Sequence, residues 1–209
     1  MVIGALRFGA MSTESGLRER KRIAAMRRIQ EVALDLFDSR GFDKVTIEQI
    51  ARAAEVSTSS VYRYFGTKEQ LVLHDEFDLQ LLEAVQRELA SHTPVDAVRR
   101  AISTLMKQFF SRDEELARRK IRYWAEEPAV QAAAAEQSDQ FAQAVADALA
   151  QAAGRQPGDL DVQVIAATLV WAMIAAARHW YASGSANPLE EELQRALTLV
   201  ENGLRLDSG

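Results

Sequence analysis

Apolar residues recur at steps of three and four from residue 18 onward, and this spacing constrains the fold more than any other feature of the chain. Such steps place side chains on one face of an α-helix. No stretch alternates with a period of two among β-branched residues, so the sequence predicts no strands. We therefore expect an all-α protein. The first apolar stripe consists of Ile23, Met26, Ile29, Val32, Ala33, Leu36 and Phe37.

Capping residues divide the chain into about nine expected helices. Thr46 followed by Gln49 is a capping-box pattern, and Gly41 is typical of a helix C-terminus. Pro94 and Pro128 stand at first helical positions, where the missing N–H costs nothing. The expected helices cover residues 18–40, 46–53, 58–64, 68–91, 94–111, 113–126, 128–153, 159–183 and 188–206.

Composition excludes several kinds of site. The 209 residues are 48% hydrophobic and 26% charged, as in an ordinary globular protein, and they include no cysteine. Disulfides, thiolate catalysis and Cys-based zinc sites are therefore excluded, and His74, His92 and His179 show no paired metal spacing. No apolar run approaches the roughly 18 residues of a membrane helix. We expect no metal, no membrane partner and a cytoplasmic location.

Charge is distributed unevenly along the chain. Residues 17–68 carry 11 Lys or Arg against 7 Asp or Glu, whereas residues 69–209 carry 13 against 22. Attraction to phosphates is local because salt screens it within roughly 10 Å, so a basic segment binds nucleic acid even in a protein of net charge −5. A solvated charged surface without a partner would give the same asymmetry.

Residues 46–68 are predicted to form two short helices joined by a tight turn. Small residues are needed where two such helices cross, and Ala51 and Ala54 supply them. Val61 and Phe65 anchor the second helix, while Val56 fills the turn. The outward face of the second helix is then rich in hydroxyls and suits contact with phosphates and base edges: Thr58, Ser59, Ser60, Tyr62, Arg63 and Tyr64.

This segment resembles the DNA-binding domain of the TetR family of repressors, over about fifty residues. The matching positions are Leu36-Phe37, Gly41-Phe42, Thr46, Ile50-Ala51, Val56-Ser57, Val61 to Phe65, and Lys68. The resemblance implies phosphate contacts by Thr46 and Tyr64, a backbone contact by Lys68, and base or backbone contacts by Ser57, Thr58, Ser60, Tyr62 and Arg63.

Two groups in this region have alternative interpretations, and one residue departs from the family pattern. Tyr62 either contacts DNA or packs on the first helix. Arg22, with Arg18, Arg20 and Lys21, is either a phosphate clamp or a solvated basic end. Glu55 stands where the family usually has glycine, so it must adopt a left-handed or otherwise costly conformation, or the turn must differ.

The stretches 16–21 and 72–75 are similar to the subgroup whose ligand domain binds an acyl-CoA-like molecule, as in mycofactocin regulators. This resemblance implies a small-molecule effector rather than a cofactor. The expected organisation is a flexible tail over 1–17, a helix-turn-helix DNA-binding domain over 18–67 and a ligand-binding and dimerisation domain over 68–209.

Two further sets of residues are predicted in the third segment. Ligand-binding candidates are bulky side chains with cationic anchors: Phe77, Leu81, Phe109, Tyr123, Trp124, Phe141, Trp171 and Arg178, with Arg122 and His179 as further anchors. The last two helices are expected to pair with a second copy through Ile165, Leu169, Met173, Leu193, Leu197 and Val200. Ordinary core packing within one subunit is the alternative explanation for both sets.

These features together predict a sequence-specific transcriptional regulator that binds double-stranded operator DNA as a homodimer. Two recognition helices are needed to read a palindrome, and ligand binding would release the repressor from it. An activator remains an alternative, as does a helical interaction module that has lost DNA binding, which Glu55 would favour. An enzyme built on a helical bundle would use Glu126, Glu127, Asp159 and Asp161, but no Glu-x-x-His pair, nucleophile elbow or phosphate loop accompanies them.

Overall fold

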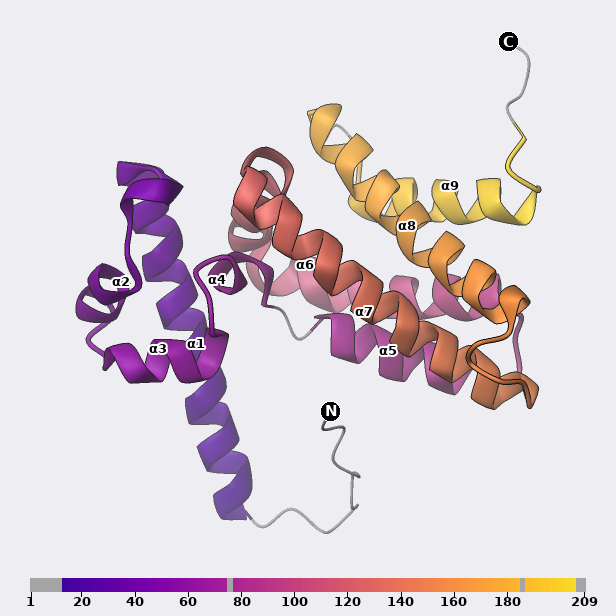
Figure 1. Ribbon diagram of the computed structural model, residues 1–209, viewed down its shortest axis with the longest axis horizontal. Helices are drawn as coiled ribbons and strands as arrows, with labels where there is room; N and C mark the ends of the chain where they lie inside the picture. Colours follow the sequence, from indigo (N-terminus) through magenta and orange to yellow (C-terminus); the bar gives the residue numbers. More distant parts are fainter. Residues whose placement is uncertain (1–12, 75–76, 185–186, 206–209) are drawn as a thin grey trace. The chain divides into compact units, whose positions relative to one another are not determined.

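Every regular element in residues 13–74, 77–184 and 187–205, which the computed structural model describes, is a helix (Figure 1). The prediction of an all-α protein is confirmed. The chain divides into two units, of which unit 1 ends at Leu71 and unit 2 begins at Val72. The elements are α1 (Thr13–Arg40), the 3₁₀ turn η1 (Phe42–Lys44), α2 (Ile47–Ala53), α3 (Thr58–Phe65), α4 (Gln70–Leu73), α5 (Phe77–Glu88), α6 (Pro94–Glu126), α7 (Pro128–Ala153), α8 (Leu160–Ala182) and α9 (Leu189–Glu201).

Several helix boundaries differ from those expected, and α9, for example, ends at Glu201 rather than at residue 206. α1 begins at Thr13 rather than at residue 18, while residues 1–12 of the expected tail lie outside the described residues. The expected helix 68–91 is interrupted, since α4 ends at Leu73 and α5 begins at Phe77. The expected helices 94–111 and 113–126 form one continuous helix, α6, because no glycine or proline stands between them.

Unit 1 is built on the buried face of α1. Ile29 and Phe37 are almost fully buried, and the Phe37 ring packs against the Phe42 ring with centroids 4.8 Å apart. Gly41, at φ 88°, ends α1, and its N–H donates to the Phe37 carbonyl over 2.8 Å. Burial of each large apolar side chain stabilises the unit by about 1.5–3 kcal/mol relative to exposure. This packing fixes the frame on which α2 and α3 lie.

Unit 2 has two hydrophobic clusters. The larger one joins α5, α6, α8 and α9 around Ile102, Leu169 and Leu197. The smaller one joins α7 and α8, where Ala146 and Ala166 are small enough for the two helices to approach closely. α8 takes part in both clusters and is therefore the central helix of the unit.

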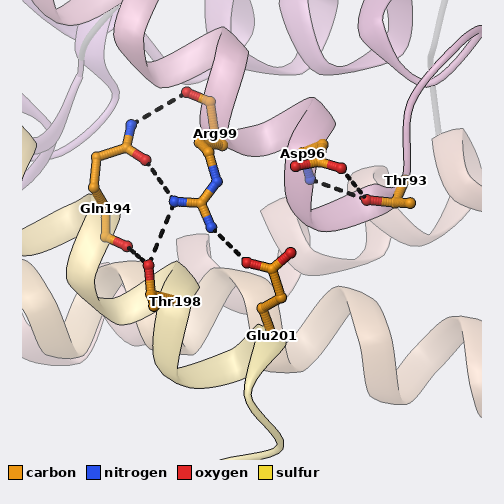
Figure 2. A network of polar contacts seen from close by, with 6 residues as sticks. All are labelled: Thr93, Asp96, Arg99, Gln194, Thr198 and Glu201. Carbon is orange, nitrogen blue, oxygen red and sulfur yellow. Dashed lines mark hydrogen bonds and ion pairs between the residues drawn. The ribbon is translucent and has the colours of Figure 1, made fainter.

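Arg99 ties α9 to α6 through a polar network (Figure 2). Its guanidinium donates to the Gln194 Oε1 over 3.1 Å and forms an ion pair with Glu201 at 3.0 Å. Thr198 accepts a longer bond of 3.5 Å from the same guanidinium. Because the network is partly exposed, we assign it a stabilisation of at most about 1 kcal/mol, and its main effect is to fix the register of α9 on α6.

The sequence-based expectation about apolar runs needs correction at α8. By length and composition this 23-residue helix is apolar enough to cross a membrane, and it is the one such helix within the described residues. Its buried side, however, packs on α7 and α9, and Trp180 within it donates from its indole N–H to the Asn187 carbonyl at 2.7 Å. Such packing is typical of the core helix of a helical domain.

Candidate DNA-binding surface, dimer surface and ligand cavity

The turn between α2 and α3 places Glu55 in the left-handed region, at φ 57°. The expectation of a costly conformation at this position is confirmed, and such a residue costs roughly 1–2 kcal/mol relative to a right-handed one. The Glu55 carboxylate pairs with Arg28 of α1 at 3.2 Å, with both side chains largely exposed. Ala51 and Ala54 are buried at the helix crossing. The predicted pair of short helices is therefore formed despite the departure from glycine.

Serine hydroxyls organise the N-terminus of α3. The Ser57 Oγ caps the helix by accepting from the Ser60 N–H over 3.2 Å, and it also lies 2.8 Å from the Ser60 Oγ and 3.0 Å from the Ser59 Oγ. The sequence analysis assigned Ser57 only to DNA contact and missed this capping role. The signal was present, because serine immediately before a helix is a preferred N-cap.

The outward face of α3 is accessible to a partner. Tyr62 is 49% exposed, and Ser59 and Arg63 are exposed as well. The Arg63 guanidinium lies 4.9 Å from the centroid of the half-buried Tyr64 ring and donates to the Ser60 Oγ over 3.3 Å. Stacking and hydrogen bonding restrict the Arg63 rotamers, so the guanidinium is held ready for a planar partner.

Thr46 and Lys68 carry structural contacts in addition to their predicted role at phosphates. The Thr46 Oγ1 accepts from the Gln49 N–H over 3.3 Å, and the Thr46 N–H donates to the Gln49 Oε1 over 3.1 Å, which confirms the capping box. The Lys68 ammonium donates to the Phe42 carbonyl over 2.8 Å and lies 4.3 Å from the Phe42 ring centroid. Their phosphate contacts stay predictions.

The basic end of α1 is exposed at Arg18, Lys21 and Arg22. The Arg22 guanidinium lies 3.0 Å from the Met26 Sδ, one turn along the same helix. The side chain of Arg20 lies outside the described residues. This row of exposed cations is consistent with both interpretations of the segment, namely a clamp that contacts DNA phosphates and a basic helix end that contacts only solvent.

Unit 2 contains a largely apolar cavity of about 300 Å³. Four of the predicted ligand-binding residues line it: Phe77, Leu81, Trp124 and Phe141. α5, α6, α7, α8 and α9 all contribute to its wall, which is therefore assembled from helices far apart in the sequence. A cavity of this size and character suits a small apolar or amphipathic molecule.

The remaining ligand predictions fall elsewhere. Trp171 is not among the lining residues and is 38% exposed, so the structure does not bring it to the cavity. Tyr123 and Arg178 also do not line the cavity, and the Arg178 guanidinium lies over the Trp124 ring at 5.3 Å. Helical spacing alone does not show which side of α6 or α8 faces inward. The side chain of Phe109 lies outside the described residues.

The cation that lines the cavity is Lys120, which the sequence analysis missed. Its ammonium donates to the His74 carbonyl over 2.8 Å. Arg122, the anchor expected in this part of α6, instead stacks over the Tyr123 ring at 5.0 Å. A signal existed, because Lys120 stands one helical turn before Trp124, on the same face of α6.

Much of the predicted dimer surface is core. Leu169, Leu193 and Leu197 are buried within their own subunit, and Leu169, Leu193 and Met173 line the cavity, so the structure places these four residues inside unit 2. Leucines at helical spacing mark a buried face without showing which partner buries it. Ile165 is exposed and Val200 is half-buried. The exposed large apolar residues of α8 and α9 are Leu160 (76%), Val164 (53%), Ile165 (40%), Trp171 (38%) and Leu199 (44%).

Three of the four carboxylates considered for an enzyme, Glu126, Asp159 and Asp161, have structural partners. Arg155 pairs with Asp159 at 2.7 Å and with Asp161 at 3.4 Å, and the hydrogen bond from Arg155 lowers the pKa of Asp159. The Tyr181 hydroxyl donates to the Glu126 Oε1 over 2.5 Å, a bond that raises the pKa of Tyr181. Within the described part of the chain no group of three or more His, Asp or Glu residues could hold a metal ion.

An exposed recognition helix behind a capped turn, followed by a helical unit with a cavity, defines a helix-turn-helix transcriptional regulator that binds DNA. Residues 29–74 match the model of the bacterial regulatory proteins of the tetR family, and residues 92–205 match that of the MftR C-terminal domain. The chain belongs to the TetR family, with a C-terminal domain of the MftR type.

Relatives and solved structures agree with this assignment. MftR of Mycobacterium tuberculosis, assigned as a mycofactocin biosynthesis transcriptional regulator, is 28% identical over 188 residues, or 88% of this chain and 93% of its own length. The repressor FadR of Thermus thermophilus, solved in complex with lauroyl-CoA, is 26% identical with a TM-score of 0.53, covering 88% of this chain and 97% of its own. NalD of Pseudomonas aeruginosa shares the fold, with 20% identity and a TM-score of 0.56 over 90% of this chain and 100% of its own.

Proposed function

We propose that this regulator is a repressor that occupies a palindromic operator as a homodimer and leaves it when a small amphipathic effector fills the cavity of unit 2. The observation that carries the proposal is the apolar cavity of about 300 Å³ in a chain that also presents the exposed face of α3. A cavity of this kind gives a ligand a place to bind without competing for the DNA surface.

Two comparisons support the repressor and the effector class. The Rv3405c protein of Mycobacterium tuberculosis, named a transcriptional repressor, is 38% identical over 85 residues, 40% of this chain. The FadR structure contains lauroyl-CoA, whose acyl chain is apolar and whose remainder is anionic. An acyl-CoA-like effector is therefore the class we propose, and no cofactor is needed for the cycle. The repressor would act in the cytoplasm, where operator DNA is found.

The exposed apolar residues of α8 and α9 form the proposed dimer surface. Leu160, Val164 and Ile165 are exposed along α8, and Leu199 is exposed on α9. Apolar side chains at this density on two neighbouring helices are typical of an interface rather than of a free surface. A twofold axis through this surface presents two α3 helices, as a palindrome requires.

The proposed release follows from two conformations in equilibrium. An effector shifts such an equilibrium only by its difference in affinity for the two conformations. Moving the population from 1% to 99% requires about 5.5 kcal/mol of such a difference, and partial release requires less. The effector must therefore make contacts in the released conformation that the operator-bound conformation lacks.

The proposal is tested by selecting bound DNA from fragments of the source genome and titrating lauroyl-CoA against the recovered site. We expect a palindromic site, a complex of two chains per site, and release by lauroyl-CoA at micromolar concentrations. Deletion of the coding sequence should raise transcription from the selected promoter, whereas a fall would indicate an activator. Recovery of no specific fragment would contradict the proposal.

A further inference from the structure

Trp124 belongs both to the cavity wall and to the surface of unit 2. Its side chain is half-buried and lines the cavity, and the guanidinium of Arg178 lies over its ring, 5.3 Å from the centroid. Arg178 is exposed and directly follows Ala177, which also lines the cavity. The cavity therefore comes within one side chain of solvent at this point, between the C-terminal parts of α6 and α8.

Three arginines in this part of unit 2 lie over aromatic rings. Arg118 is 5.7 Å from the centroid of the Trp180 ring, and Arg122 is 5.0 Å from that of the Tyr123 ring. Neither of these rings is among those that line the cavity, whereas the ring under Arg178 is. Of the three stacked cations, Arg178 is therefore the one placed to contact a molecule that enters the cavity.

We propose that Arg178 binds the anionic head group of the effector outside the cavity, while the apolar chain passes Trp124 and fills the interior. The inference rests on the proposed function, because it specifies how the effector of the same cavity is held. The chemical class is a molecule with one apolar chain and one anionic end, either a carboxylate or a phosphorylated group. The apolar chain lies between α5 and α8, against Leu81 and Met173.

Stacking leaves the hydrogen-bond donors of Arg178 available. A guanidinium that contacts a ring through its face keeps its N–H groups at its edge, where they match two oxygens of a carboxylate or phosphate. Within the described residues Arg178 makes the contact with Trp124 and neither a hydrogen bond nor an ion pair. The ring also restricts the Arg178 rotamers, which lowers the entropy lost when an anion binds. The anion therefore adds to the existing contact and displaces no partner.

The cavity interior is less suited to the charge than its edge at Arg178. The wall is largely apolar, so an anion buried there would lose most of its hydration. Lys120, the cation that lines the cavity, already donates to the His74 carbonyl over 2.8 Å. At Arg178 the head group keeps much of its water while the chain is buried. Glu126 and Glu127, at the C-terminus of α6, oppose an anion, so we expect the contribution of Arg178 to be moderate.

Calorimetric titration of the full-length protein with dodecanoate, dodecyl phosphate and 1-dodecanol tests the site without DNA, because the three probes share one chain. Arg178→Met should weaken the binding of both anions about fivefold, the upper range for an exposed ion pair, and that of 1-dodecanol less than about twofold. Arg178→Lys keeps the charge and should lose less than Arg178→Met. Arg118→Met removes a stacked cation whose ring does not line the cavity, so this matched control should change none of the three affinities.

Salt dependence and a ring variant separate charge from packing. The ratio of dodecanoate affinity to 1-dodecanol affinity should fall as the salt concentration rises, and it should fall less in Arg178→Met, because salt screens an exposed pair. Trp124→Ala removes a surface that contacts the chain as well as the support of the guanidinium. It should therefore weaken the binding of all three probes, whereas Arg178→Met weakens that of the anions alone.

The two sources of the anion are distinguished by the two charged probes. Tighter binding of dodecyl phosphate than of dodecanoate, with both weakened by Arg178→Met, identifies a phosphorylated head group. Dodecanoate binding that equals or exceeds dodecyl phosphate binding, with the same weakening, identifies a carboxylate. Equal losses for the anions and 1-dodecanol in Arg178→Met, or no loss for any probe, would overturn the site. A larger loss of anion binding in Lys120→Met than in Arg178→Met would also overturn it, because the head group would then lie inside the cavity.

Failure of this site and failure of the proposed function give different results. If lauroyl-CoA releases no operator but anion binding depends on Arg178, the proposed function fails and the head-group site stands. If lauroyl-CoA releases the operator equally from the wild-type protein and Arg178→Met, and the anion affinities are also unchanged, the function stands and the head-group site fails.

Discussion

Unit 1 and unit 2 present their functional residues in opposite ways. In unit 1 most of the residues predicted to contact DNA lie on one short helix, α3, and their order in the sequence is their order in space. In unit 2 the residues that would face a ligand are buried or half-buried and come from six helices, α4 to α9. The first surface depends on local spacing, and the second depends on how distant helices pack.

This difference explains why one unit has a recognisable motif and the other does not. A DNA duplex has a fixed groove geometry, so the turn, the caps and the exposed face of α3 must keep their spacing. An apolar cavity needs only volume and a few polar groups, which many combinations of side chains provide.

The largest effect is expected from a core leucine that the sequence analysis placed at the dimer surface. Leu197 is fully buried, at 0% exposure, so Leu197→Ala should lower the free energy of unfolding by about 2–5 kcal/mol. Urea denaturation measures this loss.

The matched control is Leu199→Ala on the same helix, because Leu199 is 44% exposed. Leu199→Ala should change dimer dissociation, followed by sedimentation at several concentrations, more than it changes subunit stability. Equal effects of the two variants on unfolding would contradict the corrected interface.

The next effect concerns base reading by α3. Arg63→Ala should weaken binding to the selected operator by about 1–3 kcal/mol, or roughly fivefold to 150-fold, for each half-site, because each subunit loses one bidentate base contact. Binding to random DNA should change much less. Arg63 is exposed, so the free energy of unfolding should stay within about 0.5 kcal/mol of the wild-type value. Fluorescence anisotropy with both DNAs gives the two affinities.

Arg40→Ala is the control, since Arg40 is an exposed cation at the last turn of α1, outside α3. It should alter both DNA affinities by a similar small factor. Equal losses on operator and random DNA in Arg63→Ala would show that Arg63 contributes charge alone.

Sequence analysis anticipated most of unit 1 because its signals are local. The capping box at Thr46, the buried alanines at the helix crossing and the left-handed Glu55 each depend on neighbours within a few residues. The positions at which helices begin and end in unit 2 were harder to predict. α6 runs on through residue 112 because nothing there forbids a helix, and tertiary packing decides the rest.

The candidate sites of unit 2 could be predicted only in part, for the same reason. Aromatic spacing identified Phe77, Trp124 and Phe141, which do line the cavity. The same spacing also selected Trp171, which faces outward, because a helical repeat shows that a face exists but not what covers it. Lys120 was overlooked because the partner of its ammonium, the His74 carbonyl, is 46 residues away in the chain.

A smaller effect is expected at the turn of unit 1. Glu55→Gly removes the left-handed strain at φ 57° and should raise the free energy of unfolding by about 1 kcal/mol. The ion pair with Arg28 is exposed, so its loss offsets only a few tenths of this gain. Glu55→Gln keeps the strain and removes the charge, so it should leave stability nearly unchanged. If both variants destabilise the protein, the Arg28–Glu55 pair outweighs the strain.

The smallest effect in free energy is expected at Lys68, where a structural contact and a predicted phosphate contact coincide. Lys68→Met keeps the apolar stem over the Phe42 ring and removes the bond to the Phe42 carbonyl, so unfolding should become easier by about 0.5–1 kcal/mol. If the ammonium also contacts a phosphate, the slope of log K against log salt for operator binding should become shallower by about 0.9 for each bound subunit. Anisotropy titrations at several salt concentrations measure that slope. Lys44→Met, an exposed cation of η1, provides the comparison for loss of general charge. A slope that stays at the wild-type value while stability falls would show that Lys68 stabilises unit 1 through the Phe42 carbonyl and does not contact a phosphate.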